Sequence, residues 1–303
     1  MRAHKPTELA KRLRNSPSFA LAILLLPATI IVTLVFFLSL IPVVSYSFFT
    51  YTPPGHPLYV PGSPFMREIF TLENFLKLFG EVTRYYLVRT VKISFFSAIA
   101  CLILGYPIAH SIARSKSKKI RGGLLFMTIT MFFVSAIVRA YAWITLLGRN
   151  GIINNALGVL GFGPFDLMYN ETALIIGTTH FLLPFVIISL IGSIQSIDIS
   201  LEEASRNMGA NEIQTFWKIT LPLSLPGVTA AFLLSITIGF GMFVTPWIMG
   251  AGICEMMANY IFDVMMNSNN LPFGSALSIF LLAIVLVVIF GINSYMESKI
   301  RRK

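Results

Sequence analysis

The side chains that could carry catalysis in this sequence are few and far apart. Four histidines and two cysteines show no pairing at metal-ligand or redox spacing: His4, His56, His110, His180, Cys101 and Cys254. No G-x-x-x-x-G-K-[ST] loop occurs, so the chain has no phosphate-binding loop of that type. A membrane-embedded enzyme would need a nucleophile–base pair or a metal cluster. We therefore expect a non-catalytic chain with no bound cofactor of its own; if ATP drives it, ATP and Mg²⁺ bind to another chain.

A second set of polar and aromatic side chains lies within or beside long apolar stretches and could meet a solute: Arg139, Tyr141, Trp143, His180, Trp247 and Asp263. An ionisable side chain at the centre of a membrane helix costs about 2.5–3.5 kcal/mol. Arg139 therefore either reaches the membrane interface with its charged end or lines a pathway. Tyr141 and Trp143 also fit the aromatic belt of an interface, and His180 also fits a hydrogen-bonded packing role. Trp247 and Asp263 would meet a cationic solute or only solvent.

A polar segment further along the chain carries the signals of a short helix. Ser200 and Glu203 have the S/T-x-x-E spacing of a capping box, which predicts a helix start. Leu201, Ala204 and Met208 then recur at helical spacing and predict one apolar face.

The end of this helix is predicted at Gly209, because glycine tolerates the backbone that terminates a helix. An apolar stretch over residues 216–221 follows, and Pro222 is expected to break it. Residues 198–222 therefore predict a helix, a glycine turn and a second element.

The composition places all of these residues in a membrane protein. Of the 303 residues, 55% are hydrophobic and 12% are charged, whereas an ordinary soluble domain is about 25% charged. A spanning helix needs about 20 apolar residues. Six stretches reach or approach that length: Phe19–Ile41, Val88–Ala113, Gly122–Leu147, Thr172–Gln195, Pro226–Met249 and Pro272–Tyr295. We predict an all-α integral membrane protein with six transmembrane helices, in which residues 88–295 form a five-helix core.

The basic residues predict the orientation of these spans. With six spans, one side of the membrane carries residues 1–18, 114–121, 196–225 and 296–303, which hold 16 of the 23 lysines and arginines. Cytoplasmic loops carry the excess of positive charge, so we place this side and both termini in the cytoplasm. The net charge of +10 is then a topology signal and gives no reason to expect a nucleic-acid partner.

The first loop on the opposite side, residues 42–87, is rich in proline and is expected to be mostly extended in the periplasm. One short amphipathic helix is predicted in it, over Thr71–Phe79. The first span is too long for the apolar region of a signal peptide and is interpreted as a retained helix.

The segment between the fourth and fifth spans resembles the EAA loop of ATP-binding-cassette (ABC) importer permeases. That motif reads E-A-A, three residues, G, nine residues and I-x-L-P, and here it stands as Glu203-Ala204-Ser205, Gly209 and Ile219-Thr-Leu221-Pro222. Ser205 in place of the second alanine is the one departure. Four other segments resemble the spermidine/putrescine permease branch: Gly105-Tyr-Pro107-Ile-Ala, Val138-Arg-Ala-Tyr-Ala-Trp143, Asn150-Gly-Ile-Ile-Asn-Asn155-Ala-Leu-Gly and Pro272-Phe-Gly-Ser-Ala276.

The resemblance implies the type I importer fold in a bacterial inner membrane and a coupling helix that sits in a groove of a separate ATPase. The candidate ATPase-coupling residues are Glu203, Ala204, Ser205, Gly209, Ile219, Leu221 and Pro222. It further implies two ATPase subunits, a second permease chain, an external solute-binding protein and a small-molecule substrate, with a polyamine as the best match.

Other interpretations remain open at this point. No Asp or Glu lies deep in a predicted span, so carboxylates for a polyamine would come from outer loops, the second permease or the binding protein. An importer of another small solute, such as an amino-acid derivative, an opine or a phosphonate, is the alternative, and the charge of Arg139 would suit an anionic or zwitterionic solute. An ion-coupled secondary transporter would favour ionisable residues at mid-membrane and internal repeats, and it leaves the EAA-like loop unexplained.

Overall fold

The computed structural model describes residues 17–53 and 66–300, and most of them are helical. The long helices are α2 (Pro17–Ser47), α4 (Glu81–Arg114), α8 (Glu171–Gln195), α14 (Leu271–Ile300) and the continuous run of α10 (Glu212–Thr215), η1 (Phe216–Thr220) and α11 (Leu221–Phe240). These five are long and apolar enough to cross a membrane, and a bent helix pair makes up to six. The all-α membrane fold is therefore confirmed.

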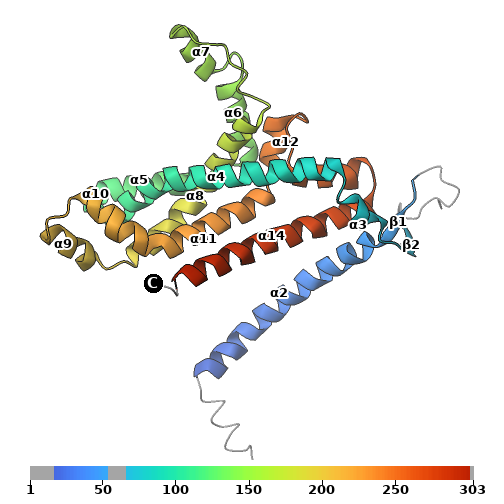
Figure 1. Ribbon diagram of the computed structural model, residues 1–303, viewed down its shortest axis with the longest axis horizontal. Helices are drawn as coiled ribbons and strands as arrows, with labels where there is room; N and C mark the ends of the chain where they lie inside the picture. The colour runs from blue at the N-terminus through green and yellow to red at the C-terminus, as the bar shows by residue number, and fades with distance from the viewer. Residues whose placement is uncertain (1–16, 54–65, 301–303) are drawn as a thin grey trace, which may run out of the picture.

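Helices α4, α8 and α11 lie side by side and form the centre of the bundle (Figure 1). Small residues allow the close approach that drives helix packing in lipid. A Cβ added at Gly105 of α4 would lie 3.2 Å from Val186 of α8. One added at Gly227 of α11 would lie 2.1 Å from Ser193 of α8. Helix α14 packs on the outside of this centre, against α11 and α2.

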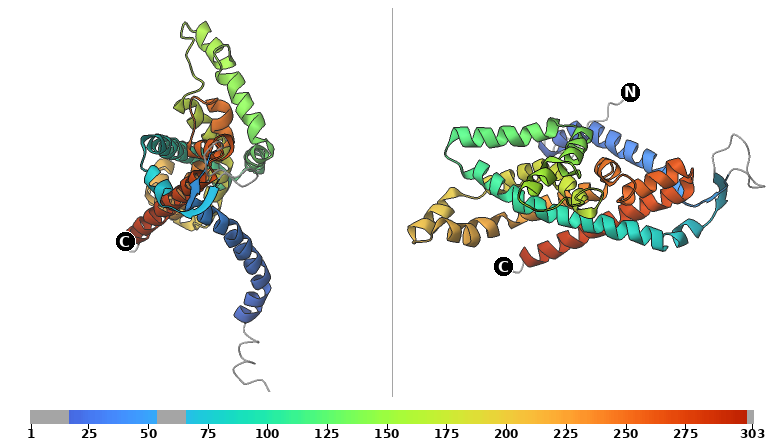
Figure 2. Two further views of the ribbon diagram at one scale, coloured as in Figure 1. Left: turned by 90° about the vertical axis from the view of Figure 1, so that its right-hand side faces the viewer. Right: turned by 90° about the horizontal axis from the view of Figure 1, so that it is seen from above.

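The remaining elements occupy the ends and one flank of the bundle. They are β1 (Phe49–Tyr51), β2 (Met66–Phe70), α3 (Glu73–Lys77), α5 (Lys118–Phe133), α6 (Ala136–Leu147), α7 (Ile152–Val159), α9 (Ile199–Asn207), α12 (Val244–Gly250), α13 (Met257–Phe262) and η2 (Asp263–Asn267). Helices α9 and α10 lie at one end, and α3 with the antiparallel pair β1–β2 lies at the other (Figure 1). Helices α6 and α7 project sideways as an arm, and α2 leaves the bundle on the opposite side (Figure 2).

The third predicted span, Gly122–Leu147, is wrong as a single straight helix. Helices α5 and α6 meet at a bend of 102°, because Val134 and Ser135 take an extended backbone. The guanidinium of Arg139 in α6 donates hydrogen bonds back to the carbonyls of Met131 and Val134. It thereby satisfies two acceptors that the end of α5 leaves without helix partners.

The fifth predicted span, Pro226–Met249, is also wrong at its end. Helix α11 ends at Phe240, and the chain turns at Gly241 into the short α12. The side-chain amide of Asn259 donates a 3.1 Å hydrogen bond to the Phe243 carbonyl at this break. The apolar composition continues across the turn, which is why hydropathy did not reveal it.

The outer loop predicted over residues 42–87 is shorter than expected at both ends. Helix α2 continues through Pro42, and α4 already begins at Glu81. A proline removes one helix hydrogen bond, and the apolar residues that follow Ile41 still favour a helix in lipid. The short helix expected within Thr71–Phe79 is confirmed as α3.

Three predicted segments fall partly outside the described residues. They are the N-terminal segment 1–18, the proline-rich stretch over 54–65 and the end of the C-terminal tail, 301–303. The tail predicted to begin at residue 296 is helical up to Ile300, because α14 continues to that point.

Candidate functional site

Helix α9 begins two residues earlier than the predicted capping box requires. The Asp198 carboxylate accepts a 2.9 Å hydrogen bond from the Ser200 backbone N–H and is the N-cap. The same hydrogen bond lowers the pKa of Asp198 below its ordinary value. The capping box of Ser200 and Glu203 is therefore wrong, because Ser200 already lies inside the helix. Both residue types favour N-caps, and the sequence did not distinguish them.

The predicted apolar face of α9 points away from the bundle. Leu201 is 47% exposed, Met208 is 82% exposed, and Glu203 and Ala204 are exposed as well. The buried face of the helix is polar and carries Glu202 and Ser205. Helix α9 thus shows the reverse of the pattern of a helix in a soluble protein, which buries its apolar side.

Glu202 attaches α9 to the bundle, and sequence reasoning did not identify it. One carboxylate oxygen, Oε1, accepts hydrogen bonds from Nε of Arg114 (3.0 Å) and from Oγ1 of Thr220 (3.0 Å). The same Arg114 donates through Nη2 to the Ile197 carbonyl at 3.0 Å. The ion pair is nearly enclosed, with side chains 12% and 7% exposed for Arg114 and Glu202. Two adjacent glutamates at 202 and 203 were the available signal, since neighbours on a helix face different directions.

Gly209 ends α9 as predicted, with a φ of +91°. Glycine adopts that backbone without steric cost. Asn211 and Gln214 then form a capping box that starts α10. Ser205 and Thr215 lie 3.2 Å apart, oxygen to oxygen, and join α9 to the end of α10. Ser205 therefore faces inward, whereas Ala204 beside it faces outward.

Pro222 does not break the second element. The helix runs without interruption from Glu212 to Phe240, and the proline lies in the first turn of α11. The turn before it is a π-helix, in which the N–H of Leu221 donates to the Phe216 carbonyl five residues earlier. Ile219 and Leu221 are half-buried. Single π-turns inside α-helices often occur at functional sites.

Three of the predicted pathway residues meet between α6 and α8. The Trp143 indole donates a 3.1 Å hydrogen bond to Nδ1 of His180, which is the kind of contact that the packing interpretation of His180 expects. Arg139 is 6% exposed, and its guanidinium lies 5.3 Å from the ring centre of Phe181. Its charged end is therefore enclosed by the chain. Tyr141 points elsewhere and is 59% exposed.

The other two candidates lie away from α9, one in α12 and one in η2. Trp247 of α12 is exposed and stacks on Phe243. Asp263, in the helical turn that follows α13, accepts a hydrogen bond from the Asn267 side chain. Among the described residues, no group of three or more His, Cys, Asp or Glu side chains is arranged to hold a metal ion.

Asp263 belongs to a cluster of carboxylates and tyrosines. Tyr86 of α4 and Tyr260 of α13 stack with ring centres 4.6 Å apart. Burial, and next the charge of Asp263, raises the pKa of Glu255 above its ordinary value. Burial also raises the pKa of Tyr260. Arg89 acts on Glu255 in the opposite direction, so this region carries charges of both signs.

Comparison with known proteins places these features in one family. The family described as "Binding-protein-dependent transport system inner membrane component" matches residues 95–302. The spermidine/putrescine transport system permease protein PotB of Haemophilus influenzae is 34% identical over 79% of this chain and 85% of that protein. PotB of Escherichia coli is 33% identical over 78% and 87%, respectively.

Solved structures agree on the fold. A chain of a bacterial alginate ABC transporter, in complex with an alginate-bound periplasmic protein, superposes with a TM-score of 0.75 at 19% identity, covering 96% of this chain and 98% of that one. A chain of the methionine ABC transporter MetNI gives 0.56 at 18% identity, covering 72% and 98%. The sequence matches and the shared architecture lead to one conclusion: this chain belongs to the family of inner-membrane permease components of binding-protein-dependent ABC importers.

Proposed function

We propose that α9 is the coupling helix through which a separate ATPase drives this permease. The observation that carries the proposal is the exposed apolar face of α9, formed by Leu201, Ala204 and Met208, on a helix whose other face is fixed by Glu202. Exposed apolar surface next to polar residues marks a site for a protein partner. A short helix held rigidly at its back can transmit a push to the helices that hold it.

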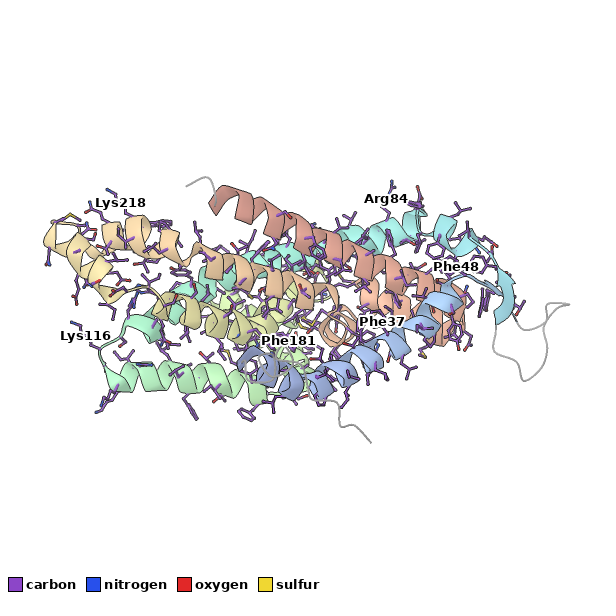
Figure 3. The ribbon with its side chains drawn as sticks, turned by 90° about the horizontal axis from the view of Figure 1, so that it is seen from below. Phe37, Phe48, Arg84, Lys116, Phe181 and Lys218 are labelled. Atoms are coloured by element: carbon purple, nitrogen blue, oxygen red, sulfur yellow. The ribbon has the colours of Figure 1, made fainter. Side chains whose placement is uncertain are left out.

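The end of the bundle that carries α9 is proposed to face the cytoplasm. Lys116 and Lys218 lie at this end, and Arg84 lies at the other (Figure 3). The segment 114–121 carries five basic residues and no acidic one. Cytoplasmic loops are enriched in Lys and Arg, so both termini are assigned to that side.

The proposed assembly has two ATPase subunits on the cytoplasmic side, a second permease that completes the solute pathway and a solute-binding protein at the outer side. ATP and Mg²⁺ would bind to the ATPase subunits. The family itself is named for dependence on a binding protein, and the alginate transporter was solved with its periplasmic protein bound.

The proposed substrate is a polyamine such as spermidine or putrescine. Two relatives above 30% identity over more than three quarters of this chain are spermidine/putrescine permeases. The cluster of Glu255, Asp263, Tyr86 and Tyr260 supports the assignment, because carboxylates and aromatic faces attract a flexible polycation.

The test is purification of the tagged chain under mild conditions, mass spectrometry of bound proteins, and reconstitution of the complex in liposomes. We expect an ATPase chain and a second permease to copurify, and ATP-dependent uptake of labelled spermidine. Glu203→Lys should abolish uptake while Lys116→Gln, a charge change on an exposed residue at the same end, leaves it intact. Ion-gradient-driven uptake by the isolated chain would overturn the coupling role. Uptake of an amino-acid derivative or a phosphonate in place of spermidine would overturn the substrate assignment only.

A further inference from the structure

Helix α4 has no direct chain connection to the coupling helix. Helix α9 follows α8 after a short turn, and α10 with η1 continues directly into α11. A push on α9 therefore reaches α8 and α11 through the backbone. It reaches α4, the longest helix in the described part of the chain, only through side chains.

Three of those side chains lie in a row along one face of α4. Tyr106, His110 and Arg114 stand at i, i+4 and i+8, so they lie above one another on the helix surface. The Tyr106 hydroxyl lies 2.7 Å from the Ser224 hydroxyl of α11. The rings of Tyr106 and His110 both meet the edge or face of Phe216 in η1, at 5.4 and 5.7 Å between centres.

Arg114 is the last residue of this row and contacts α9 itself. Its Nη2 lies 2.9 Å from Oε1 of Glu202, and the same carboxylate oxygen accepts from Thr220 of η1. One oxygen atom thus joins the end of α4, the buried face of α9 and the π-helical turn. A buried ion pair adds little net stability compared with an apolar pair of equal size. What it supplies is a fixed relative position of the three segments.

The outer part of α4 makes an equally specific contact. The Thr90 hydroxyl accepts a 2.7 Å hydrogen bond from the backbone N–H of Met257, at the start of α13. Tyr86 stacks on Tyr260 one turn further out. Helix α4 therefore connects the coupling helix with the carboxylate and tyrosine cluster that lies near the other end of the bundle.

We propose that Arg114 and Glu202 are positioning residues that make α4 move together with α9. The movement that the ATPase imposes on α9 is then transmitted along α4 to the carboxylate and tyrosine cluster. The inference rests on the proposed coupling function and adds the contacts through which the movement of α9 is transmitted to α4. Loss of the pair leaves the ATPase contact surface of α9 in place, since Leu201, Ala204 and Met208 lie on the opposite face.

The test uses the whole complex of permeases, ATPase and binding protein in liposomes. Arg114→Gln and Glu202→Gln each remove one charge, and the double variant removes both and leaves no unpaired buried ion. The measured quantities are ATPase binding, ATP hydrolysis and solute molecules taken up per ATP. We expect each single variant to lower uptake per ATP by about fivefold or more, with ATPase binding retained. The double variant should be no worse than either single one, because the residues act as a pair.

Two comparisons keep the outcomes separate. Lys116→Gln, an exposed charge two residues beyond Arg114, should leave uptake per ATP unchanged. If the single variants fail to assemble, the double variant alone decides, since it carries no uncompensated charge. Unchanged uptake per ATP in assembled variants, or additive losses in the double variant, would overturn the inference. A wild-type chain that binds no ATPase would instead overturn the proposed function.

Discussion

The contact between Gly227 and Ser193 is where a single methyl group should do most damage to the bundle. Gly227 lies in α11 and Ser193 in α8, the two helices that are connected by the segment containing α9. A Cβ at Gly227 would lie 2.1 Å from both Cβ and Oγ of Ser193, whereas ordinary contact begins at 3.4 Å. In Gly227→Ala the helices must therefore separate by more than 1 Å, or Ser193 must shift with its backbone.

The expected cost follows from two opposing effects. Overpacking of this kind destabilises by about 1–3 kcal/mol. Alanine in place of glycine inside a helix stabilises by about 0.8–1 kcal/mol. Gly192→Ala isolates the second effect, because nothing lies within 4 Å of a Cβ at that position, next to Ser193 in the same helix. We expect Gly227→Ala to be less stable than Gly192→Ala by roughly the whole overpacking cost, about 1–3 kcal/mol.

The assay is thermal and denaturant unfolding of the purified variants in detergent. Gly192→Ala should melt at or above the wild-type temperature, and Gly227→Ala below it. Adding Ser193→Gly to Gly227→Ala removes the hydroxymethyl group that the new methyl group would strike and should restore most of the lost stability. Equal melting of the two alanine variants, or a failure of Ser193→Gly to restore Gly227→Ala, would refute the close-approach reasoning.

Three further outcomes follow from individual residues. Gly209→Asn should keep ATP-driven uptake and Gly209→Val should lose it. The φ of Gly209 is +91° and a Cβ there meets nothing within 4 Å, so within the chain only backbone strain distinguishes the two variants. Equal losses of uptake would point to a steric clash with the partner. Burial and the charge of Asp263 raise the pKa of Glu255 above 4.5, so the folded state holds the proton more tightly. Wild-type stability relative to Glu255→Gln should then fall as pH rises above 4.5 through the raised pKa, which pH-dependent melting curves would check. Arg139→Gln should lower stability by about 1–3 kcal/mol, since carbonyls including that of Met131 lose a charged donor, and an unchanged melting temperature with a raised KM for solute would instead favour a pathway role.

Most of the apolar helices and the segment between α8 and α11 could be predicted because they depend on local composition and spacing. Apolar length predicted the helices, and the spacing from Glu203 to Pro222 predicted the segment that leads into α11. The breaks after α5 and α11 could not be predicted, because both sides of each break are apolar. What decides them is the supply of hydrogen bonds, from Arg139 in one case and Asn259 in the other.

The pair Glu202 and Glu203 shows the same limit at the site itself. The motif drew attention to Glu203, which is exposed, while Glu202 carries the contacts within the chain. Which of two adjacent glutamates turns inward depends on Arg114, 88 residues away in sequence. Local patterns carry no information about contacts at that separation, so the inward residue could be identified only from the fold.

The two faces of α9 together explain why this helix suits a coupling role better than a purely structural one. A helix stabilised only within its own chain would bury Leu201 and Met208 and expose its charges. Here the bundle holds α9 by a carboxylate and leaves those apolar side chains exposed. Hydrogen bonds and an ion pair fix position and direction, whereas apolar contact allows a partner to bind by shape. The polar face therefore fixes the helix to its own chain, and the apolar face remains exposed, as the proposed contact with an ATPase requires.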